Sequence, residues 1–415
     1  MRIAVVGAGI SGLVCAHLLR EEHDLTIFEA NDYAGGHTHT VRVDTADETH
    51  HVDTGFIVHN DRTYPRFERL LESVGVATQA APMSFSVSDG RGGLEYNGAS
   101  ANGLFANRAN LLSPSFHRMV LDLLRFNRDA PALVGLNGSG PSLREFLDEG
   151  GYSEAFVDRL LVPQASAVWS ADPASMWEFP ASLLAEFFAN HGMFGFTGRP
   201  RWRAVSGGSA RYVERLTSGF AKSLRLSAPV RRVVRLEDRV EVTPAGAEPM
   251  AFDEVILATH SDQALAMLAD PTPAEHEVLG AIRYQPNDVV LHTDSSLLPR
   301  RRRAWASWNF HLQDRPVGRT TVTYHMNRLQ TLAADREFCV TLNRSEDVDP
   351  DTVIRKLRYD HPAYTAEALA AQARWAEVSG RNRTHYCGAY WGYGFHEDGV
   401  ASGLRVCERF GKTLA

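Results

Sequence analysis

The residues best suited to chemistry stand at the start of the chain, where three glycines and an acid have the spacing of a dinucleotide site. Gly7, Gly9 and Gly12 form a GxGxxG run after the apolar stretch 2–6, and Glu29 follows seventeen positions after Gly12. Gly7 permits a tight turn, Gly9 lets a pyrophosphate approach backbone N–H groups, and Gly12 lets a helix pack closely on a strand. Glu29 can accept hydrogen bonds from ribose hydroxyls. The sequence therefore predicts a dinucleotide-binding fold.

The elements that must position these residues are a strand, a glycine turn and a helix, followed by a second strand that ends at Glu29. Ile10 and Ser11 open the predicted helix, whose N–H groups and positive end face a pyrophosphate. Ala30 follows the acid, and a second glycine turn with a histidine lies at 35–37. This second turn can pass over the same pyrophosphate.

A third predicted strand, residues 50–58, carries Asp53, Thr54 and Gly55. With this strand, the run from residue 1 to about 78 resembles the flavin amine oxidase and phytoene desaturase superfamily, whose members share GxGxxG, an acid, GGR and a D-x-G-G-like strand. Over its whole length the chain resembles the bacterial NAD/FAD-binding proteins described beside cyclopropane-fatty-acid-synthase-like methyltransferases. Some of that group are flavin-dependent desaturases of methylated fatty acyl chains.

The resemblance implies an α/β, amine-oxidase-like fold that binds FAD. A Rossmann-like FAD-binding domain (1–78, 203–270 and 375–415) is interleaved with an α+β substrate domain (79–202 and 271–374) that has an antiparallel sheet and helices. The implied cofactor-binding residues are Gly7, Gly9, Ile10, Ser11, Gly12, Glu29, Ala30, Gly35, Gly36, His37, Thr54, Gly55, Val230, Gly388, Phe395, His396 and Glu397.

The closing segment 384–409 reads as a strand, a glycine-rich turn and a helix. By the resemblance, Gly388 lies near the pyrophosphate, and the helix that starts at 396–398 points its positive end at the flavin N1–C2=O edge. A helix N-terminus stabilises the negative charge that arrives there with a hydride. Phe395 then lies at the substrate face of the ring, and the backbone at Val230 meets the adenine.

The chain departs from the amine oxidase pattern at three positions. His37 stands where an arginine is frequent after the glycine pair, Asn287 matches the position of a lysine that bridges a water to flavin N5, and Phe395 replaces a frequent tyrosine. These departures argue against amine oxidation. They leave flavin chemistry on C–C bonds untouched.

An apolar tract offers a place for such a substrate. It contains Trp169, Met176, Trp177, Phe179, Leu183, Leu184, Phe187, Phe188, Met193, Phe194 and Phe196. Part of this tract is expected to be core, and the remainder either is core too or lines a tunnel for an alkyl chain. Each buried methylene of such a chain is worth about 0.8 kcal/mol.

Two groups of arginines could contact the headgroups of a membrane. Ser113–Pro114 begins a predicted helix with Phe116, Met119, Val120, Leu123 and Leu124 on one face and Arg118, Arg125 and Arg128 on the other. We expect this helix to pack inward with a solvated basic face, although it could also lie on a lipid surface. Residues 300–303 are four arginines beside Trp305 and Trp308, a composition that suits anionic headgroups or a solvated loop.

The amino-acid composition limits the class of protein and the compartment that remain possible. The chain has 415 residues, 22% charged residues and a net charge of −7, with no sign of nucleic-acid binding. Its cysteines, Cys15, Cys339, Cys387 and Cys407, form no CxxC pair and favour a reducing compartment. No signal peptide and no apolar run near about 18 residues is found. We expect a cytoplasmic protein, with peripheral contact to the inner membrane face as an open alternative, and no metal site.

The sequence thus predicts an FAD-dependent oxidoreductase that desaturates a fatty acyl chain, free or in phospholipid, by hydride transfer to flavin N5. The candidate bases are His39, His191, Tyr393 and His396, with His59 and Tyr324 beside them. Three alternatives stay open. They are a fatty acid double-bond isomerase, a non-catalytic lipid-binding flavoprotein that partners a fatty-acyl methyltransferase, and an amine oxidase.

Overall fold

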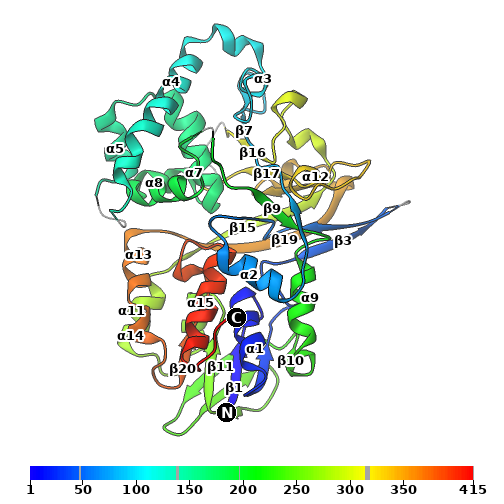
Figure 1. Ribbon diagram of the computed structural model, residues 1–415, viewed down its shortest axis with the longest axis vertical. Coiled ribbons are helices and arrows are strands. Elements are labelled where there is room, and N and C mark those ends of the chain that lie inside the picture. The colour runs from blue at the N-terminus through cyan, green and yellow to red at the C-terminus, as the bar shows by residue number, and fades with distance from the viewer. Residues whose placement is uncertain (46–47, 137–139, 196, 314–317, 415) are drawn as a thin grey trace.

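A parallel five-stranded sheet forms one end of the molecule (Figure 1). The computed structural model describes residues 1–45, 48–136, 140–195, 197–313 and 318–414. The order across the sheet is β10-β2-β1-β14-β20 and all neighbours pair in parallel. Its strands are β1 (Arg2–Val6), β2 (Asp24–Phe28), β10 (Leu224–Arg225), β14 (Glu254–Leu257) and β20 (Thr384–Tyr386). The sheet therefore joins the beginning, the middle and the end of the chain, while the exact domain limits stay a prediction.

Helices cover this sheet, and a small antiparallel sheet flanks it (Figure 1). The small sheet consists of β11 (Val230–Arg235), β12 (Val240–Pro244) and β13 (Met250–Phe252). The helices of this half are α1 (Ile10–Leu19), α2 (Pro65–Ser73), α9 (Ala210–Ser218), α10 (Ser261–Met267), α11 (Pro273–Gly280), α13 (Ala366–Ala373), α14 (Trp375–Val378) and α15 (His396–Glu408). The strand, glycine turn and helix predicted at the start of the chain are all present.

A second, seven-stranded sheet has the order β19-β15-β18-β17-β16-β7-β8. Its strands are β7 (Phe85–Ser88), β8 (Glu95–Asn97), β15 (Tyr284–His292), β16 (Trp308–His311), β17 (Val322–His325), β18 (Cys339–Leu342) and β19 (Val353–Pro362). All pairs are antiparallel except β7 and β16, which run in parallel because they belong to separate segments of the chain. The antiparallel sheet predicted from the strands after residue 271 is confirmed, and β7 adds one parallel pair to it.

Short strands connect the two sheets. β3 (Thr40–Asp44) and β4 (Thr49–Asp53) form a hairpin, and β9 (Trp202–Val205) pairs with both β5 (Val58–Asn60) and β6 (Thr78–Ala80).

A helical region forms the opposite end of the molecule (Figure 1). It contains α3 (Ala101–Leu104), η1 (Arg108–Leu112), α4 (Pro114–Asp129), η2 (Ala130–Leu133), α5 (Leu143–Gly150), α6 (Glu154–Phe156), the π-helix η3 (Val157–Leu161), α7 (Val162–Trp169), η4 (Pro173–Glu178) and α8 (Ala181–Asn190). Ser113 caps α4, as predicted, because its Oγ accepts a hydrogen bond from the N–H of Phe116 at 3.3 Å. No helix among the described residues is long and apolar enough to cross a bilayer.

The faces of α4 differ from those expected. Phe116 and Met119 are buried, but Leu124 is 48% exposed, because the core contacts the helix along a stripe that passes through Asp122 instead. Asp122 holds the helix arginines: Arg118 Nε lies 3.0 Å from its Oδ2, and Arg125 Nη1 lies 3.6 Å from its Oδ1. These two arginines are therefore committed to a buried carboxylate rather than to a solvated face.

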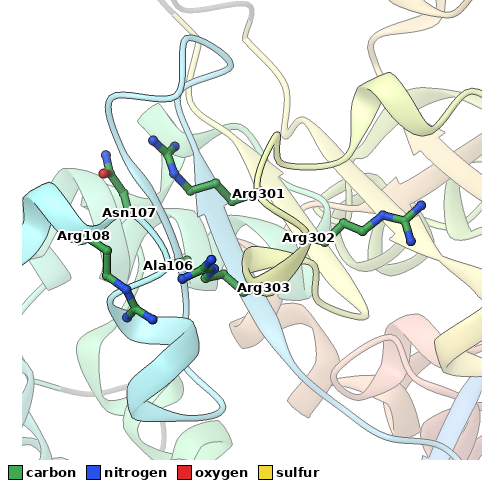
Figure 2. Close-up of a pocket in the computed structure, with 6 residues that line it drawn as sticks. All are labelled: Ala106, Asn107, Arg108, Arg301, Arg302 and Arg303. Atoms are coloured by element: carbon green, nitrogen blue, oxygen red, sulfur yellow. The ribbon is translucent and has the colours of Figure 1, made fainter.

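The arginine cluster 300–303 lies at the same end of the molecule. Arg301, Arg302 and Arg303 line an open pocket of about 400 Å³ together with Arg108 (Figure 2). Trp305, for which a headgroup contact and a solvated loop were both open, is only 9% exposed, and its indole N–H donates to the carbonyl of Pro299.

The apolar tract that was considered for a tunnel joins one hydrophobic core. Trp169, Met176, Phe179, Leu183, Leu184, Phe187 and Phe188 are buried in it, and Trp177, Met193 and Phe194 pack against it. Phe196 lies outside the described residues. The tract is therefore core for the larger part, and its member Phe187 stacks on Phe395.

Candidate active site

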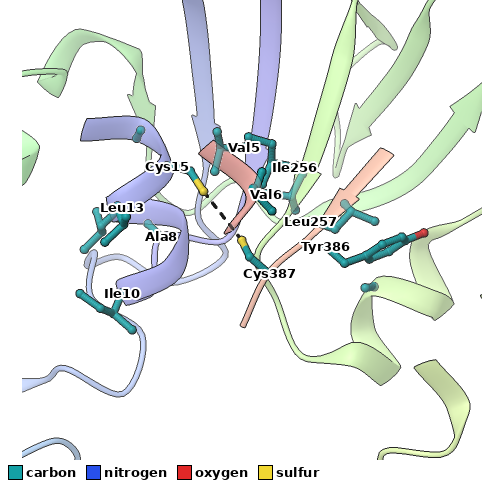
Figure 3. Close-up of a cluster of buried hydrophobic side chains, with 14 of the residues drawn as sticks. Val5, Val6, Ala8, Ile10, Leu13, Cys15, Ile256, Leu257, Tyr386 and Cys387 are labelled. Atoms are coloured by element: carbon teal, nitrogen blue, oxygen red, sulfur yellow. Dashed lines mark hydrogen bonds between the residues drawn. The ribbon is translucent and has the colours of Figure 1, made fainter. Parts of the chain in front are cut away.

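The glycine turn between β1 and α1 is packed so closely that only glycine fits. Gly7 has a φ of +100°, and a Cβ on Gly12 would lie 2.0 Å from the Gly7 carbonyl oxygen. Helix α15 crosses α1 closely as well, because the Ser11 hydroxyl donates to the carbonyl of Gly399 at 2.8 Å. Behind the turn, the buried cluster of β1, β14 and β20 brings the Sγ atoms of Cys15 and Cys387 to 3.9 Å (Figure 3).

Gly9 is the exception in this tight turn. A Cβ at this position would meet no atom within 4 Å, so the space beside it is open. Gly9 also precedes the first N–H groups of α1, and its helix end has no side-chain cap. Uncapped N–H groups beside open space are what a phosphate needs.

Glu29 lies at the carboxyl end of β2, buried with 6% of its surface exposed. Its Oε2 accepts from the N–H of Ala8 at 2.8 Å, and its Oε1 accepts from the N–H of Asn31 at 2.9 Å. A carboxylate has about four acceptor positions, so two remain for ribose hydroxyls. The carbonyl of Glu29 also accepts from the N–H of Ala228, which brings the predicted adenine residue Val230 to the same edge. Ala30 is exposed beside it.

The second glycine turn touches the first. The N–H of Gly35 donates to the carbonyl of Ala8 at 2.8 Å, and a Cβ on Gly36 would lie 3.2 Å from the Cα of Gly9. Gly55 lets the backbone of His37 approach, because a Cβ there would lie 2.1 Å from its carbonyl oxygen. Thr54 binds the same loop by donating to the carbonyl of His39 at 2.9 Å. The structure thus brings these predicted cofactor residues together.

The closing segment forms the predicted strand, glycine-rich turn and helix, which are β20 and α15. The N–H of Gly388 donates to Ser402 Oγ at 3.1 Å, and Phe395 precedes α15. The carboxylate of Glu397 accepts from the backbone N–H groups of Arg66 and Phe67 at 3.0 and 2.9 Å. These N–H groups open α2, so the carboxylate of Glu397 joins α15 to α2.

A group of three partly accessible imidazoles lies beside the second glycine turn. The ring of His37 is 5.7 Å from that of His260 and 5.5 Å from that of His361, and it meets Tyr359 edge-on at 4.9 Å. Loss of hydration, reinforced by the neighbouring imidazoles, holds the pKa of His37 well below its ordinary value. His37 therefore carries no charge at neutral pH, unlike the arginine of the resembling proteins.

A relay of amide groups sets the tautomer of His361. Asn343 Oδ1 accepts from the N–H of Asp288 at 3.0 Å, so its amide nitrogen faces Asn287 and donates to Oδ1 at 2.7 Å. The amide nitrogen of Asn287 then donates to Nδ1 of His361 at 3.1 Å. Desolvation lowers the pKa of His361 to about 4. The neutral ring must therefore carry its proton on Nε2.

His191 has the opposite tautomer. Its Nδ1 lies 2.8 Å from the carbonyl oxygen of Phe187, which can only accept, so Nδ1 carries the proton. Nε2 is therefore the accepting nitrogen, and the Thr63 hydroxyl lies 3.4 Å from it. Its ring stacks on Phe187 at 3.9 Å and lies 6.3 Å from Phe395. Burial lowers the pKa of His191 to about 4. We call His191, Phe187, Phe395 and Trp202 the aromatic wall.

The other candidate bases are committed to local contacts. His396 Nε2 lies 2.8 Å from both Thr38 Oγ1 and Tyr212 OH, and burial keeps its pKa well below the ordinary value. His39 stacks on the ring of Tyr33 at 4.1 Å, with its Nδ1 3.3 Å from Tyr359 OH. Both contacts fix the loop that follows Gly36, at Thr38 and at His39, and we call this loop the cofactor loop.

Three further candidates lie in the substrate region or behind the cofactor loop. The Tyr393 hydroxyl donates to Glu186 at 3.1 Å, beside the aromatic wall. Tyr324 meets Trp308 edge-on in the second sheet, and burial raises its pKa to about 12. His59 is fully buried, 2.6 Å from Glu68.

Sequence reasoning missed His260, His361, Tyr359 and Asn343. His260 follows the apolar run that forms β14, and residues at the carboxyl ends of parallel strands face the ligand crevice, so its position was a usable signal. His361 and Tyr359 lie on β19, a strand that was not predicted, and no local pattern marked them.

The glycine turn 7–12, which we call the glycine cradle, and the buried Glu29 lie at the carboxyl edge of the parallel sheet, an arrangement typical of dinucleotide-dependent oxidoreductases. The chain belongs to the flavin containing amine oxidoreductase family, whose model matches residues 10–321. None of the curated proteins matches this sequence.

Solved structures share the fold at low sequence identity. A putrescine oxidase variant is 17% identical with a TM-score of 0.69, over 99% of this chain and 98% of that one. Cyclohexylamine oxidase from Brevibacterium oxydans IH-35A is 16% identical with a TM-score of 0.69, over 99% of each chain. A CLA-producing fatty acid isomerase from P. acnes is 15% identical with a TM-score of 0.70, over 99% of this chain and 98% of that one.

FAD fits the residues present. The open space at Gly9 beside uncapped N–H groups suits a pyrophosphate, and the free acceptor positions of Glu29 suit a ribose. Gly35 and Gly36 close over the first turn from the opposite side. The family and these residues therefore assign FAD as the cofactor.

Proposed function

We propose that this FAD-dependent oxidoreductase desaturates a fatty acyl chain, free or in a phospholipid. The observation that carries the proposal is the aromatic wall, in which Phe187 and Phe395 stack at 5.6 Å and His191 is the titratable group. Such a wall suits an alkyl chain, because burial of methylene groups drives its binding. The fold shared with a fatty acid isomerase supports the same substrate class.

Bound FAD supplies the acceptor for the hydride. The second hydrogen must leave as a proton, and His191 can take it at Nε2, since the Phe187 carbonyl keeps the other nitrogen protonated. A pKa of about 4 keeps this nitrogen unprotonated throughout the neutral range. Unactivated alkyl C–H bonds give up neither hydride nor proton readily, so we expect a substrate with a methyl branch or a double bond next to the reacting carbons.

Three alternatives remain distinguishable. A double-bond isomerase would return the hydride to the substrate, and a fatty acid isomerase has this fold. An amine oxidase would need an acceptor for an ammonium group. Two carboxylates lie beside the wall, and both already accept hydrogen bonds, Glu186 from the Tyr393 hydroxyl and Asp398 from the N–H of Phe395. A flavoprotein that only binds lipid, as partner of a fatty-acyl methyltransferase, would show flavin that no lipid reduces.

The experiment is anaerobic mixing of the FAD-loaded protein with phospholipids whose chains are straight, methyl-branched, cyclopropane-containing or unsaturated. We expect branched or unsaturated chains to bleach the visible flavin absorbance, and mass spectrometry to find an acyl chain lighter by two hydrogen atoms. Migration of a double bond without a change in mass would select the isomerase. Bleaching by putrescine or cyclohexylamine but not by lipid would overturn the proposal in favour of amine oxidation.

A matched pair of substitutions tests His191. The variant His191→Asn should reduce flavin about 100- to 10,000-fold more slowly, because it removes the proton acceptor, while FAD stays bound. His292→Asn is the control, since His292 is also buried with a pKa of about 4 but lies in the second sheet, bonded to Thr341. Equal rates for the two variants would show that His191 is not the base.

A further inference from the structure

Exposed leucines concentrate on the helical end of the molecule. Leu112 is 88% exposed, Leu121 61%, and Leu111 and Leu124 48% each. Leu121 and Leu124 are one turn apart on α4, and Leu111 and Leu112 end η1 directly before that helix. Large apolar side chains gathered in this way mark a surface that contacts a partner or a membrane.

The arginine pocket adjoins these leucines. Figure 2 shows the guanidinium groups of Arg108, Arg301 and Arg303 around Ala106 and Asn107, with that of Arg302 directed away. Arg108 also opens η1, the short helix that ends in Leu112. Through η1, the basic pocket therefore lies next to the exposed Leu111 and Leu112, and α4 follows directly.

Most of this positive charge is not neutralised within the molecule. Arg301 pairs with Glu95 at 2.6 Å. Arg108 donates to the carbonyl of Phe105 and the side chain of Asn102, both neutral, and Arg302 lies over the ring of Trp305. Within the described parts of the chain, no carboxylate lies within ion-pair distance of Arg108, Arg302 or Arg303. The arginines of α4 differ, since Arg118 and Arg125 are held by Asp122.

We propose that this leucine–arginine face (Leu111, Leu112, Leu121, Leu124, Arg108 and Arg303) docks the protein on an anionic phospholipid bilayer. The leucines enter the acyl region, and the arginines bind headgroup phosphates. Charge complementarity selects this partner, because the whole chain carries a net charge of −7 while this face is basic. Docking requires no turnover, so it stands or falls separately from the proposed reaction.

The experiment is co-sedimentation of the full-length, FAD-loaded protein with two kinds of vesicle. We expect binding to vesicles of phosphatidylcholine and phosphatidylglycerol in equal parts, weak binding to phosphatidylcholine alone, and loss of binding at high salt. The double variant Arg108→Glu, Arg303→Glu should bind at least about 25-fold more weakly, because each arginine near an anionic surface contributes about fivefold. Leu112→Ser with Leu121→Ser should weaken binding at low salt as well.

The control variant is Arg231→Glu with Arg232→Glu, an equal charge change at two exposed arginines of β11, at the other end of the molecule (Figure 1). It should bind vesicles like the parent protein. Equal binding of the two double variants, or equal binding to charged and uncharged vesicles, would overturn the proposal. Absence of binding to either vesicle would also overturn it and leave the face to a protein partner.

Discussion

The glycine cradle and the aromatic wall are built on opposite principles. The cradle uses backbone groups of nearly contiguous residues, and a single methyl group at Gly12 would lie 2.0 Å from the Gly7 carbonyl oxygen. The wall uses side chains from distant segments, such as His191 on the end of α8 and Phe395 before α15. Binding of a common cofactor therefore depends on short-range geometry, whereas choice of substrate depends on long-range packing.

The largest effect is expected from two glycine substitutions in the cradle. Gly12→Ala should abolish FAD binding and lower the free energy of unfolding by about 1 to 3 kcal/mol, because the added methyl overlaps Gly7. Gly9→Ala should leave the unfolding of the FAD-free protein unchanged and weaken FAD binding alone, because the added methyl occupies only the open space. Thermal denaturation and titration with FAD check both. If Gly9→Ala lost as much stability as Gly12→Ala, the space beside Gly9 would not be open. If Gly9→Ala bound FAD like the parent protein, Gly9 would not face the cofactor.

A smaller effect concerns acid stability, to which both regions contribute. Burial lowers the pKa of His361 beside the cradle and of His191 in the wall to about 4, whereas unfolded histidine titrates near about 6.5. The unfolded chain thus binds more protons between these values, so stability should be complete above about pH 6.5 and fall as the pH drops towards 4.

Replacement of either histidine by glutamine should reduce this slope by up to about 1.4 kcal/mol per pH unit. Urea unfolding at a series of pH values measures the slope. Unchanged slopes in both variants would mean that these rings titrate normally in the folded protein.

The smallest effect concerns the imidazole tautomers, because His361 beside the cradle and His191 in the wall carry their protons on different nitrogens. Asn287→Leu removes the donor that holds Nδ1 of His361 unprotonated, so a mixture of tautomers should replace the Nε2–H form. His191 should keep its Nδ1–H form, which depends on Phe187 instead. Nitrogen NMR of the imidazole rings distinguishes these forms, and the stability loss should be about 1 kcal/mol. An unchanged spectrum of His361 would contradict the amide relay.

Prediction from the sequence was accurate for the cradle and much weaker for the substrate region. The strands, helices and glycine turns around Gly7, Glu29 and Gly36 were recognisable because their residue types and spacing are set by local backbone geometry. In the substrate region the helices were found, but Leu124 was assigned to the core and the parallel pairing of β7 with β16 was not foreseen. Helical spacing shows that one face is apolar, but not which neighbours will cover it.

The sequence by itself therefore determined the FAD-binding fold, because a glycine that tolerates no Cβ or an acid at the end of a strand acts within its own segment. Only the tertiary structure decided that Glu397 turns to α2, that Asn343 and Asn287 orient His361, and that His191 faces Phe395. These contacts join residues that are far apart in the chain. A hydrogen-bond partner or a tautomer depends on which groups meet in space, and the linear order of residues does not contain that information.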